Sequence, residues 1–278
     1  MSGKTMFTDT EFSLIAREVK TRTGYALTPS LAPTMESRLM ALQRRENYAN
    51  VNELVAAARA NHRLWDLIAD ALAHPETRFF RDRAFFHSLR TEILPNLARN
   101  ATAGQRIRIW SAGCSTGQEA YSLAILSDEL RATGALIEIV ATDHSDRLLD
   151  KARSGLFSQF EVQRGLPIRT LIEHFEKASD LWRISDRLRA QVRFERHNLL
   201  SSADKLGQFD LVLCCNVLND MDPAPRQLAL ENIAAALTGQ GLLATGEDGV
   251  TAVAPHALTP SGQIKGIYQR NAGWRRAA

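Results

Sequence analysis

The first third of the chain carries apolar residues with the spacing of α-helices. Over residues 8–90 they recur every three, four or seven positions, and no strand-like alternation occurs. Pro29 and Pro33 interrupt this pattern and predict a break before a second helix from Met35 to Arg45. Residues 1–90 are therefore expected to form a small all-helical domain.

After residue 100 the pattern changes to short apolar runs that alternate with helical stretches. The runs are Ile107–Trp110, Ile137–Ala141, Val192–Phe194, Leu211–Leu213 and Gly241–Thr245. Such alternation predicts a mostly parallel sheet with helices on both faces, here over residues 91–278. Residues 156–189 fit the alternation poorly and are expected to be an insertion. A last strand is predicted at Gly266–Tyr268.

A glycine-containing loop follows the first predicted strand. In RIRIWSAGCSTGQEAYSLAI, Gly113 and Gly117 lie between the strand and an amphipathic helix, where they let a ligand approach the backbone closely. The spacing matches neither the GxGxxG motif of dinucleotide sites nor the GxxxxGK[ST] loop of triphosphate sites. The loop therefore favours a nucleoside ligand without a phosphate chain.

A carboxylate ends the second predicted strand. Asp143 lies 26 residues beyond Gly117, at the edge of the sheet where a carboxylate can accept hydrogen bonds from ribose hydroxyls. An aspartate here is also a common helix cap, so the residue alone identifies no ligand. Together with the glycine loop, it favours a nucleoside site.

Composition and charge exclude several classes of protein. The chain has 34 Lys and Arg against 31 Asp and Glu, and the acids are spread along it, so no nucleic-acid partner is expected. No signal-peptide or membrane-spanning run occurs, which predicts a cytoplasmic protein without membrane insertion. Cys114, Cys214 and Cys215 have no CxxC spacing, so neither a disulfide framework nor a metal site is expected.

Five segments form one larger pattern. They are ETRFFRD (76–82), WSAGCSTGQEAYSLAI (110–125), ATDHSDRLLDKARSGLF (141–157), FERHNLL (194–200) and FDLVLCCNV (209–217). In this order they resemble the bacterial chemotaxis receptor methyltransferases, the CheR family. The resemblance implies an all-helical N-terminal domain, and then an α/β, Rossmann-like class I methyltransferase domain with a small β-subdomain inserted near residues 158–190.

The resemblance also implies a reaction and its participants. The cofactor would be S-adenosyl-L-methionine, the product S-adenosyl-L-homocysteine, and the substrates glutamates on the signalling helices of chemoreceptors, which become methyl esters. The implied cofactor-binding residues are Thr77, Arg81, Gly113, Glu119, Asp143, Asn198, Leu199, Cys215 and Asn216. Thr77 and Arg81 would face the methionine part, Glu119 and Asp143 the polar groups, and Asn198 with Leu199 the adenine.

Arg81 and Asn216 are the implied catalytic residues. An ionised glutamate is already a nucleophile, so the reaction needs positioning rather than a general base. Arg81 would hold the substrate carboxylate through charge-assisted hydrogen bonds. Without the resemblance, Arg81 would be interpreted as a surface residue beside Arg78 and Arg83.

Three positions depart from the family's pattern. Pro75 replaces the Asn of NETxFFR, and in CCNVLNDMD (214–222) Cys215 replaces an Arg and Asp220 a Tyr of CRNVxIYFD. A cation and a hydroxyl are lost, and a negative charge is added where the substrate carboxylate is expected. One alternative is therefore a weakened or inactive relative that binds the cofactor and acts as a regulatory or interaction protein. Another is a methyltransferase with a different acceptor, because fold and cofactor do not fix the substrate.

Two features bear on the receptor partner. Arg38, Arg44 and Arg45 on the second predicted helix form a basic face for acidic receptor helices, or simply a solvated face. The insertion, with EHFEKASDLWRIS, lacks the extra Gly-containing loop of family members that bind a receptor's C-terminal pentapeptide. Tethering through such a pentapeptide is therefore not expected.

Overall fold

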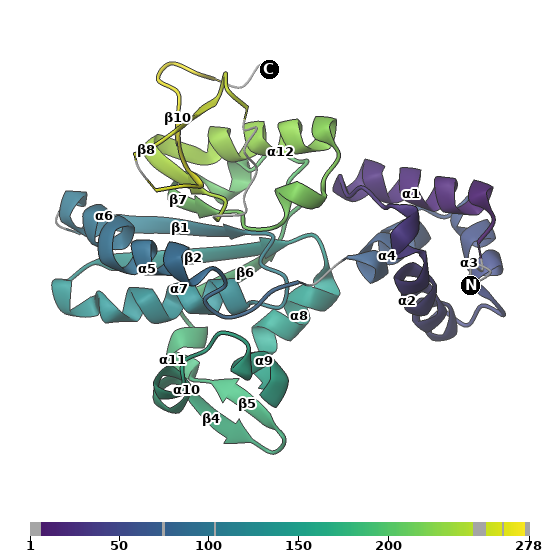
Figure 1. The fold of residues 1–278 in the computed structure, drawn as a ribbon, viewed down its shortest axis with the longest axis horizontal. Helices are drawn as coiled ribbons and strands as arrows, with labels where there is room; N and C mark the ends of the chain where they lie inside the picture. Colours follow the sequence, from purple (N-terminus) through teal and green to yellow (C-terminus); the bar gives the residue numbers. More distant parts are fainter. Residues whose placement is uncertain (1–6, 74–75, 103, 247–253, 263, 276–278) are drawn as a thin grey trace. The chain divides into compact units, whose positions relative to one another are not determined.

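The structure, a computed structural model, describes residues 7–73, 76–102, 104–246, 254–262 and 264–275 (Figure 1). The chain divides into two compact units, Met1–His74 with Asp220–Arg226, and Pro75–Asn219 with Gln227–Ala278. Each unit has its own hydrophobic core, so each is described separately.

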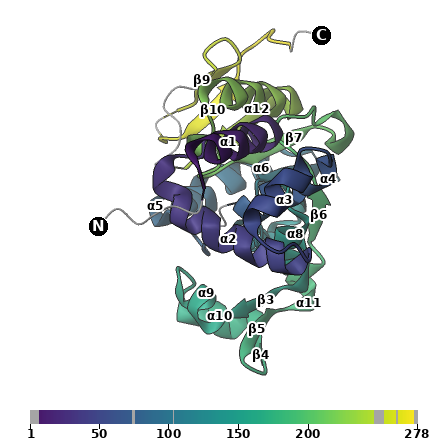
Figure 2. The ribbon, with the colours of Figure 1, turned by 90° about the vertical axis from the view of Figure 1, so that its right-hand side faces the viewer.

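Among its described residues, the first unit is a bundle of four α-helices (Figure 2). They are α1 (Asp9–Thr23), α2 (Ala32–Arg45), α3 (Val51–Ala58) and α4 (His62–Leu72), with the short 3₁₀-helix η1 (Pro29–Leu31) before α2. Thr8 and Glu11 form a capping box that begins α1. Each helix contributes fully buried side chains to the core, among them Ile15, Leu39, Leu54 and Ile68. The all-helical N-terminal domain is confirmed.

The second helix begins earlier than the sequence predicted. Pro29 lies in η1, but Pro33 lies in the first turn of α2 and not before the helix. Proline is tolerated there because the first backbone N–H groups of a helix have no partner within it. The predicted start at Met35 was therefore wrong by one turn.

The second unit is built on a seven-stranded sheet with the order β6-β2-β1-β7-β8-β10-β9. The strands are β1 (Arg106–Ala112), β2 (Leu136–Asp143), β6 (Val192–Arg196), β7 (Phe209–Leu213), β8 (Leu237–Ala244), β9 (Leu258–Pro260) and β10 (Ile267–Arg270). β6, β2, β1, β7 and β8 pair in parallel, whereas β10 pairs antiparallel with β8 and β9. Each predicted strand is present. The short edge strand β9, which ends in a proline, was not predicted.

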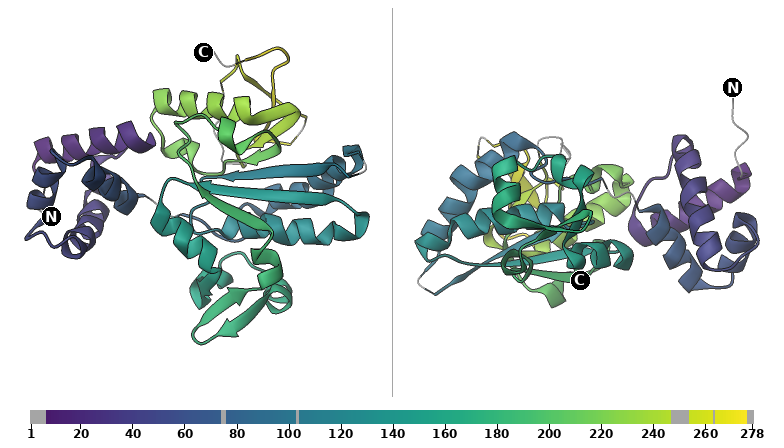
Figure 3. Two further views of the ribbon diagram at one scale, coloured as in Figure 1. Left: turned by 180° about the vertical axis from the view of Figure 1, so that it is seen from behind. Right: turned by 90° about the horizontal axis from the view of Figure 1, so that it is seen from below.

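Helices cover both faces of this sheet (Figures 1 and 3). They are α5 (Arg83–Ser88), α6 (Leu94–Asn100), α7 (Gln118–Glu129), α8 (Asp146–Ser154) and α12 (Pro223–Ala236), with the π-helical turn η2 (Leu89–Ile93) and the 3₁₀-helices η3 (Arg131–Thr133), η4 (Asp204–Leu206) and η5 (Leu218–Asp220).

Side chains alternate between the two faces of a strand. Ile109 joins the core beside α7, whereas its neighbour Trp110 packs against Phe209 on the opposite face.

The segment before β1 belongs to the second unit. Phe79, Phe85, Phe86 and Leu89 all lie in the core that includes α7. The junction between the units therefore differs from the expected boundary near residue 90. Helical periodicity continues across the junction, and periodicity alone does not reveal which core a helix joins.

A small subdomain is inserted between β2 and β6. It contains β3 (Leu156–Ser158), α9 (Gln159–Gln163), α10 (Ile168–His174), β4 (Phe175–Ala178), β5 (Leu181–Ile184) and α11 (Asp186–Arg189). Its three strands form an antiparallel sheet in the order β3-β5-β4. Figure 1 shows it beyond α7 and α8, on the side of the sheet away from α12. The predicted inserted β-subdomain is confirmed.

Arg38 is expected to stabilise the first unit. Its guanidinium Nη1 donates to the carbonyl oxygens of Leu72 and Ala73 at 3.1 and 2.8 Å, where α4 ends and carbonyls lack partners within the helix. Arg38→Gln should lower the free energy of unfolding by about 1–2 kcal/mol. The exposed Arg44 is the matched control, and Arg44→Gln should change it by less than about 0.5 kcal/mol. Urea unfolding of the intact chain measures both, and equal effects would contradict the capping role.

Candidate functional site

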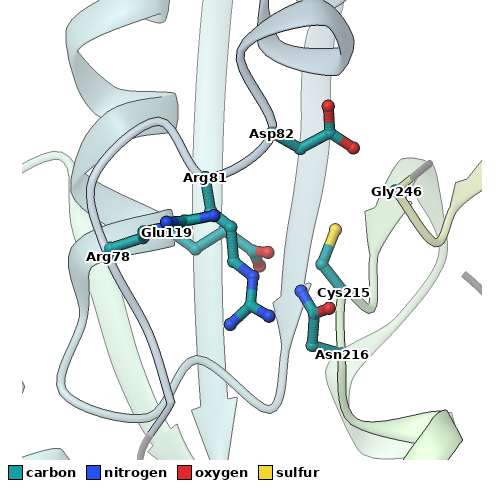
Figure 4. A pocket seen from close by; sticks show the side chains of 7 residues that line it. All are labelled: Arg78, Arg81, Asp82, Glu119, Cys215, Asn216 and Gly246. Carbon is teal, nitrogen blue, oxygen red and sulfur yellow. The ribbon is translucent and has the colours of Figure 1, made fainter. Parts of the chain in front are cut away.

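The strand order of the sheet reverses between β1 and β7. The chain runs from β1 to β2 and β6 on one side of β1, and then to β7 and β8 on the other. In open α/β sheets, the loops at the carboxyl ends of two such strands separate and leave a crevice that binds ligands. A pocket lies at this edge, lined by Arg78, Arg81, Asp82, Glu119, Cys215, Asn216 and Gly246 (Figure 4).

Separate elements of the second unit supply the pocket's side chains. The segment before α5 carries both arginines and Asp82, and the first turn of α7 carries Glu119. Cys215 and Asn216 follow β7, and Gly246 follows β8. Figure 4 shows Arg81 and Glu119 pointing into the same space as Cys215 and Asn216. The structure thus brings four of the sequence-predicted site residues together.

Four of the six described non-glycine residues with a positive φ lie at or next to this edge of the sheet, whereas Asn47 and Ser179 lie in turns elsewhere. Phe80, Asp82 and Asn216 have φ angles of 45°, 64° and 61°, and Ser115 in the glycine loop has 51°. Residues other than glycine rarely adopt this left-handed region, which costs roughly 1–3 kcal/mol for each. Such strain persists where the surrounding structure fixes it, and it clusters at functional sites. The backbone therefore points to the same location as the pocket.

Glu119 is a half-buried carboxylate with neutral donors. Ser111 Oγ donates to Glu119 Oε1 at 2.6 Å, and the Cys215 thiol also hydrogen-bonds to this carboxylate. Desolvation by burial raises the pKa of Glu119 above its ordinary value, and it outweighs these hydrogen bonds and the nearby Arg81 cation. A cationic ligand at this place would compensate the carboxylate.

Cys215 takes the place of a cation in the resembled family pattern. Burial, followed by the charge of Glu119, raises the pKa of the Cys215 thiol well above its ordinary value. The thiol therefore stays protonated and acts as a weak neutral donor. The neutral Cys215 side chain thus packs next to Glu119 without supplying the positive charge that an arginine at this position would supply.

The glycine loop between β1 and α7 is fixed by close backbone packing. Gly113 has φ 79°, and a Cβ there would lie 2.6 Å from Val217 Cγ2. The N–H groups of Gly113 and Cys114 both donate to the Thr142 carbonyl oxygen at 2.8 Å. Gly117, with φ 94°, is the N-cap residue immediately before α7. The sequence motif therefore marks a tight turn whose path only glycine permits.

Asp143 joins this loop to the end of β2. Its buried carboxylate accepts from the Ser115 N–H at 2.9 Å through Oδ2 and from the Ser145 N–H at 3.0 Å through Oδ1. Each carboxylate oxygen can accept a second hydrogen bond. Asp143 therefore has a structural role that the sequence did not reveal, and it retains capacity for ribose hydroxyls.

The remaining predicted cofactor residues lie outside this pocket. Among the described residues, its lining omits Thr77, Gly113, Asp143, Asn198 and Leu199.

Two of these residues lie after β6, beside the end of β2. Asn198 Oδ1 accepts from the Leu200 N–H at 3.0 Å, and Asn232 Nδ2 donates to the Leu199 carbonyl oxygen at 2.7 Å. The His197 N–H donates to the Asp143 carbonyl oxygen at 3.0 Å, which joins the ends of the two strands. The predicted adenine residues therefore follow a strand end next to Asp143.

Unsatisfied polar atoms occur near Asp143. In the part of the chain that the structure describes, Ser115 Oγ and His197 Nε2 are buried without a hydrogen-bond partner. Burial also lowers the pKa of His197, which favours the neutral imidazole. Buried polar atoms are normally hydrogen-bonded, so a polar nucleoside ligand would supply the missing partners. The residues present therefore fit an adenosine cofactor.

Several residues at this edge were not found from the sequence. Arg78 and Asp82 lie inside the ETRFFRD segment, so their place next to Arg81 was the available signal. Ser115 lies inside the glycine loop, where its hydroxyl was an equally available signal. Gly246 gave no signal, because only the fold brings the end of β8 to the pocket. Pro75, a predicted departure, lies outside the described residues.

Neither a group of metal ligands nor a membrane-spanning helix is found in the described ranges. No three His, Cys, Asp or Glu side chains group as metal ligands there. No helix within them combines the length and hydropathy needed to cross a bilayer.

The sheet order, the glycine loop after the first strand and the carboxylate ending the second define a Rossmann-like nucleoside-binding domain of the class I methyltransferase type. Residues 75–261 match the family model for the CheR methyltransferase SAM binding domain, and residues 10–73 match that for its all-alpha domain. The chain therefore belongs to the CheR methyltransferase family, and its cofactor is S-adenosylmethionine.

Curated relatives extend over most of the chain. Chemotaxis protein methyltransferase 1 of Pseudomonas aeruginosa is 36% identical over 215 residues, which are 75% of this chain and 78% of that protein. The chemotaxis protein methyltransferase of Vibrio parahaemolyticus is 33% identical over 245 residues, 86% of this chain and 88% of that protein. The family, fold class and cofactor expected from the sequence are confirmed.

Glu119 is expected to reduce the stability of the ligand-free protein at neutral and higher pH. Its folded-state pKa lies above the ordinary value of 4.5. Folding therefore favours the protonated form of Glu119. The resulting stabilisation is fully present below the pKa that Glu119 has in the unfolded chain, and it is lost as pH rises through the pKa that Glu119 has in the folded protein. Glu119→Gln, which cannot ionise, should raise the free energy of unfolding at about pH 8 and leave it nearly unchanged at about pH 4.

The control for this comparison lies on the same helix. Glu129 is exposed at the end of α7 and pairs with Arg90 at 2.8 Å, so Glu129→Gln should give no stabilisation at either pH. Denaturant unfolding at the two pH values measures both variants. A Glu119→Gln protein no more stable than wild type at about pH 8 would contradict the uncompensated carboxylate.

Proposed function

We propose that this chain is a protein-glutamate O-methyltransferase that esterifies glutamates on the cytoplasmic signalling helices of chemoreceptors. The supporting observation is the pairing of Arg81 and Glu119 in one pocket, a cation for an incoming carboxylate beside a carboxylate for a cationic cofactor. The names of the relatives, chemotaxis protein methyltransferases, agree with a receptor substrate.

The chemistry needs placement more than proton transfer. S-adenosylmethionine supplies a methyl group on a positively charged sulfur, so a glutamate oxygen forms the new C–O bond as the C–S bond breaks, leaving the thioether product. Glu119 would hold the cofactor's positive charge, and Asp143 its ribose. Asn198 and Leu199 would hold the adenine. The protein's task is then to exclude water and to align the carboxylate with the methyl group.

Arg81 is suited to align the substrate. Its Nη1 donates to the Glu76 carbonyl oxygen at 2.8 Å and lies 3.7 Å from Glu76 Oε1. A guanidinium has five N–H donors, so further donors remain for a substrate carboxylate. The Asn216 amide on the facing wall adds a neutral donor, and Thr77 and Gly113 would complete the cofactor's surroundings.

The direct test is transfer of a labelled methyl group from S-adenosylmethionine to cytoplasmic fragments of chemoreceptors. The expected product is base-labile, because it is a methyl ester. Absence of label with several receptor fragments, under conditions in which the protein binds S-adenosylhomocysteine, would overturn the proposed activity.

Arg81→Gln is expected to lower kcat/KM for methyl transfer about 10- to 100-fold, because hydrogen bonds to a charged group contribute about 1.5–3 kcal/mol. Arg83→Gln is the control, since Arg83 is exposed at the start of α5 and lies outside the pocket lining. Steady-state assays with receptor fragments measure both variants. Wild-type kcat/KM in Arg81→Gln would exclude Arg81 from the reaction.

A second function rests on Cys215. With a neutral thiol beside Glu119, the pocket keeps the carboxylate for a cationic cofactor but lacks the cation that the family's pattern has at the position of Cys215. Asp220, the other departure, groups with the first unit, where its carbonyl oxygen accepts from the Ala26 N–H at 2.8 Å. These features favour a regulatory or interaction protein that binds the cofactor.

Substitution separates the two functions. If the chain is a methyltransferase, the wild-type protein should transfer the methyl group. If it is a regulatory protein, the wild type should bind S-adenosylhomocysteine without turnover, and the Cys215→Arg, Asp220→Tyr double variant should gain methyl transfer. The labelled-methyl assay on both proteins decides, because turnover by wild type contradicts the regulatory function.

A further inference from the structure

Arg78 lines the candidate pocket but has no part in the reaction described so far. Figure 4 shows its side chain on the pocket lining together with that of Arg81. Arg78 is exposed to solvent, and it forms no hydrogen bond or ion pair with another described residue. A guanidinium carries five N–H donors and stays charged at physiological pH. Among the described residues, none therefore competes with a ligand for the Arg78 donors.

The second arginine of the pocket is already engaged. Arg81 Nη1 donates to the Glu76 carbonyl oxygen at 2.8 Å and lies 3.7 Å from Glu76 Oε1. The Glu76 carboxylate therefore offsets part of the Arg81 charge. No described ion pair offsets the charge of Arg78 in the same way.

The backbone that carries both arginines is held by the core. Phe79 and Phe80, the two residues between them, are both buried. The Phe80 N–H donates to Ser122 Oγ of α7 at 3.0 Å. Packed cores leave little freedom to such a segment. Arg78 and Arg81 therefore extend from fixed backbone positions, although Arg78 itself is exposed.

The charges of the pocket balance only when Arg78 is included. Its described lining has two cations, Arg78 and Arg81, and two carboxylates, Asp82 and Glu119. Burial is the main reason why the pKa of the Cys215 thiol is raised, and the charges of Glu119 and Asp82 add to it, so both acids act on the same place. Without Arg78 the carboxylates would outnumber the cations, and a further carboxylate would be repelled.

The position of Arg78 in the sequence adds to this picture. In the pattern NETxFFR it occupies the variable position x, directly after Thr77. At Cys215 the chain lacks an arginine that the family's pattern contains. The chain has therefore lost one arginine of the pattern and has another at a position that the pattern leaves open, and both positions line one pocket.

We propose that Arg78 replaces the arginine missing at Cys215 and binds the carboxylate of the acceptor glutamate together with Arg81. The proposal rests on the proposed function, because it assigns a second substrate-binding residue to the same reaction. Two guanidinium groups on one carboxylate keep it ionised and restrict its orientation towards the methyl group. Arg78 thereby makes the pocket selective for an anionic acceptor, even though residue 215 is neutral.

The first test is Arg78→Gln in the intact chain. Its KM for receptor cytoplasmic fragments should rise roughly tenfold with kcat within about threefold, because the contact exists in the bound substrate as well as in the transition state. Arg78→Lys keeps the charge and should raise KM by less than about threefold. Arg83→Gln, outside the pocket lining, is the matched control. Equal KM values in Arg78→Gln and Arg83→Gln would overturn the proposal.

Cofactor binding separates two carboxylates that Arg78 could meet. S-adenosylmethionine and S-adenosylhomocysteine also carry a carboxylate, on the methionine and homocysteine parts. If Arg78 binds the acceptor, calorimetry should give a Kd for S-adenosylhomocysteine within about twofold of wild type in Arg78→Gln. A Kd at least about tenfold weaker would place Arg78 on the cofactor instead and overturn the proposal.

Replacement of one arginine by the other is tested by restoring the family's residue. In the Arg78→Gln background, Cys215→Arg should return KM to within about threefold of wild type, because residues that do the same task have non-additive effects. A merely structural role for Arg78 predicts no such recovery. A folded double variant with the KM of Arg78→Gln would overturn the replacement.

Fragment binding is measured apart from turnover, so that Arg78 and the proposed function can fail separately. A fluorescein-labelled receptor fragment is titrated with the protein loaded with S-adenosylhomocysteine. If wild type transfers no methyl group but Arg78→Gln binds the fragment roughly tenfold more weakly than Arg83→Gln, the enzyme activity is contradicted and the role of Arg78 is supported. If wild type is active and the two variants have equal Kd and KM, only the role of Arg78 is contradicted. A fragment that wild type neither binds nor methylates overturns both.

Discussion

A half-buried carboxylate whose charge is only partly compensated lies at the centre of this protein's candidate site. Glu119 is held by the Ser111 hydroxyl and the Cys215 thiol, and burial outweighs the nearby Arg81 cation. Folding places this unfavourable charge at the carboxyl edge of the sheet, beside strained backbone at Asp82 and Asn216. Such features cost stability and provide a site that a cationic cofactor can satisfy.

The same segment connects the site to the inserted subdomain. Phe79 contributes its ring to the aromatic cluster of the insertion and its carbonyl to the packing of Gly165, while Arg81 reaches the pocket. The position of the segment that carries Arg81 therefore depends on packing against the inserted subdomain as well as against the main core.

Much of the fold could be predicted from the sequence, because apolar runs and glycines reflect local constraints. The strands, the loop at Gly113 and the carboxylate at Asp143 are of this kind. Other features depend on packing that periodicity does not report. Arg38 was expected on a basic face, and nothing in the sequence indicated that its guanidinium also donates to the carbonyl oxygens at the end of α4. Gly246 joins the pocket only through the sheet's topology.

The central claim is that the edge of the sheet around Glu119 and Asp143 binds S-adenosylmethionine. Calorimetric titration of the intact protein with S-adenosylmethionine near neutral pH tests it most directly, with Glu119→Gln alongside. The account predicts saturable binding of one molecule per chain, weakened in the variant because the cationic ligand loses its carboxylate. No measurable affinity in the wild-type protein, or equal affinity in both, would contradict it.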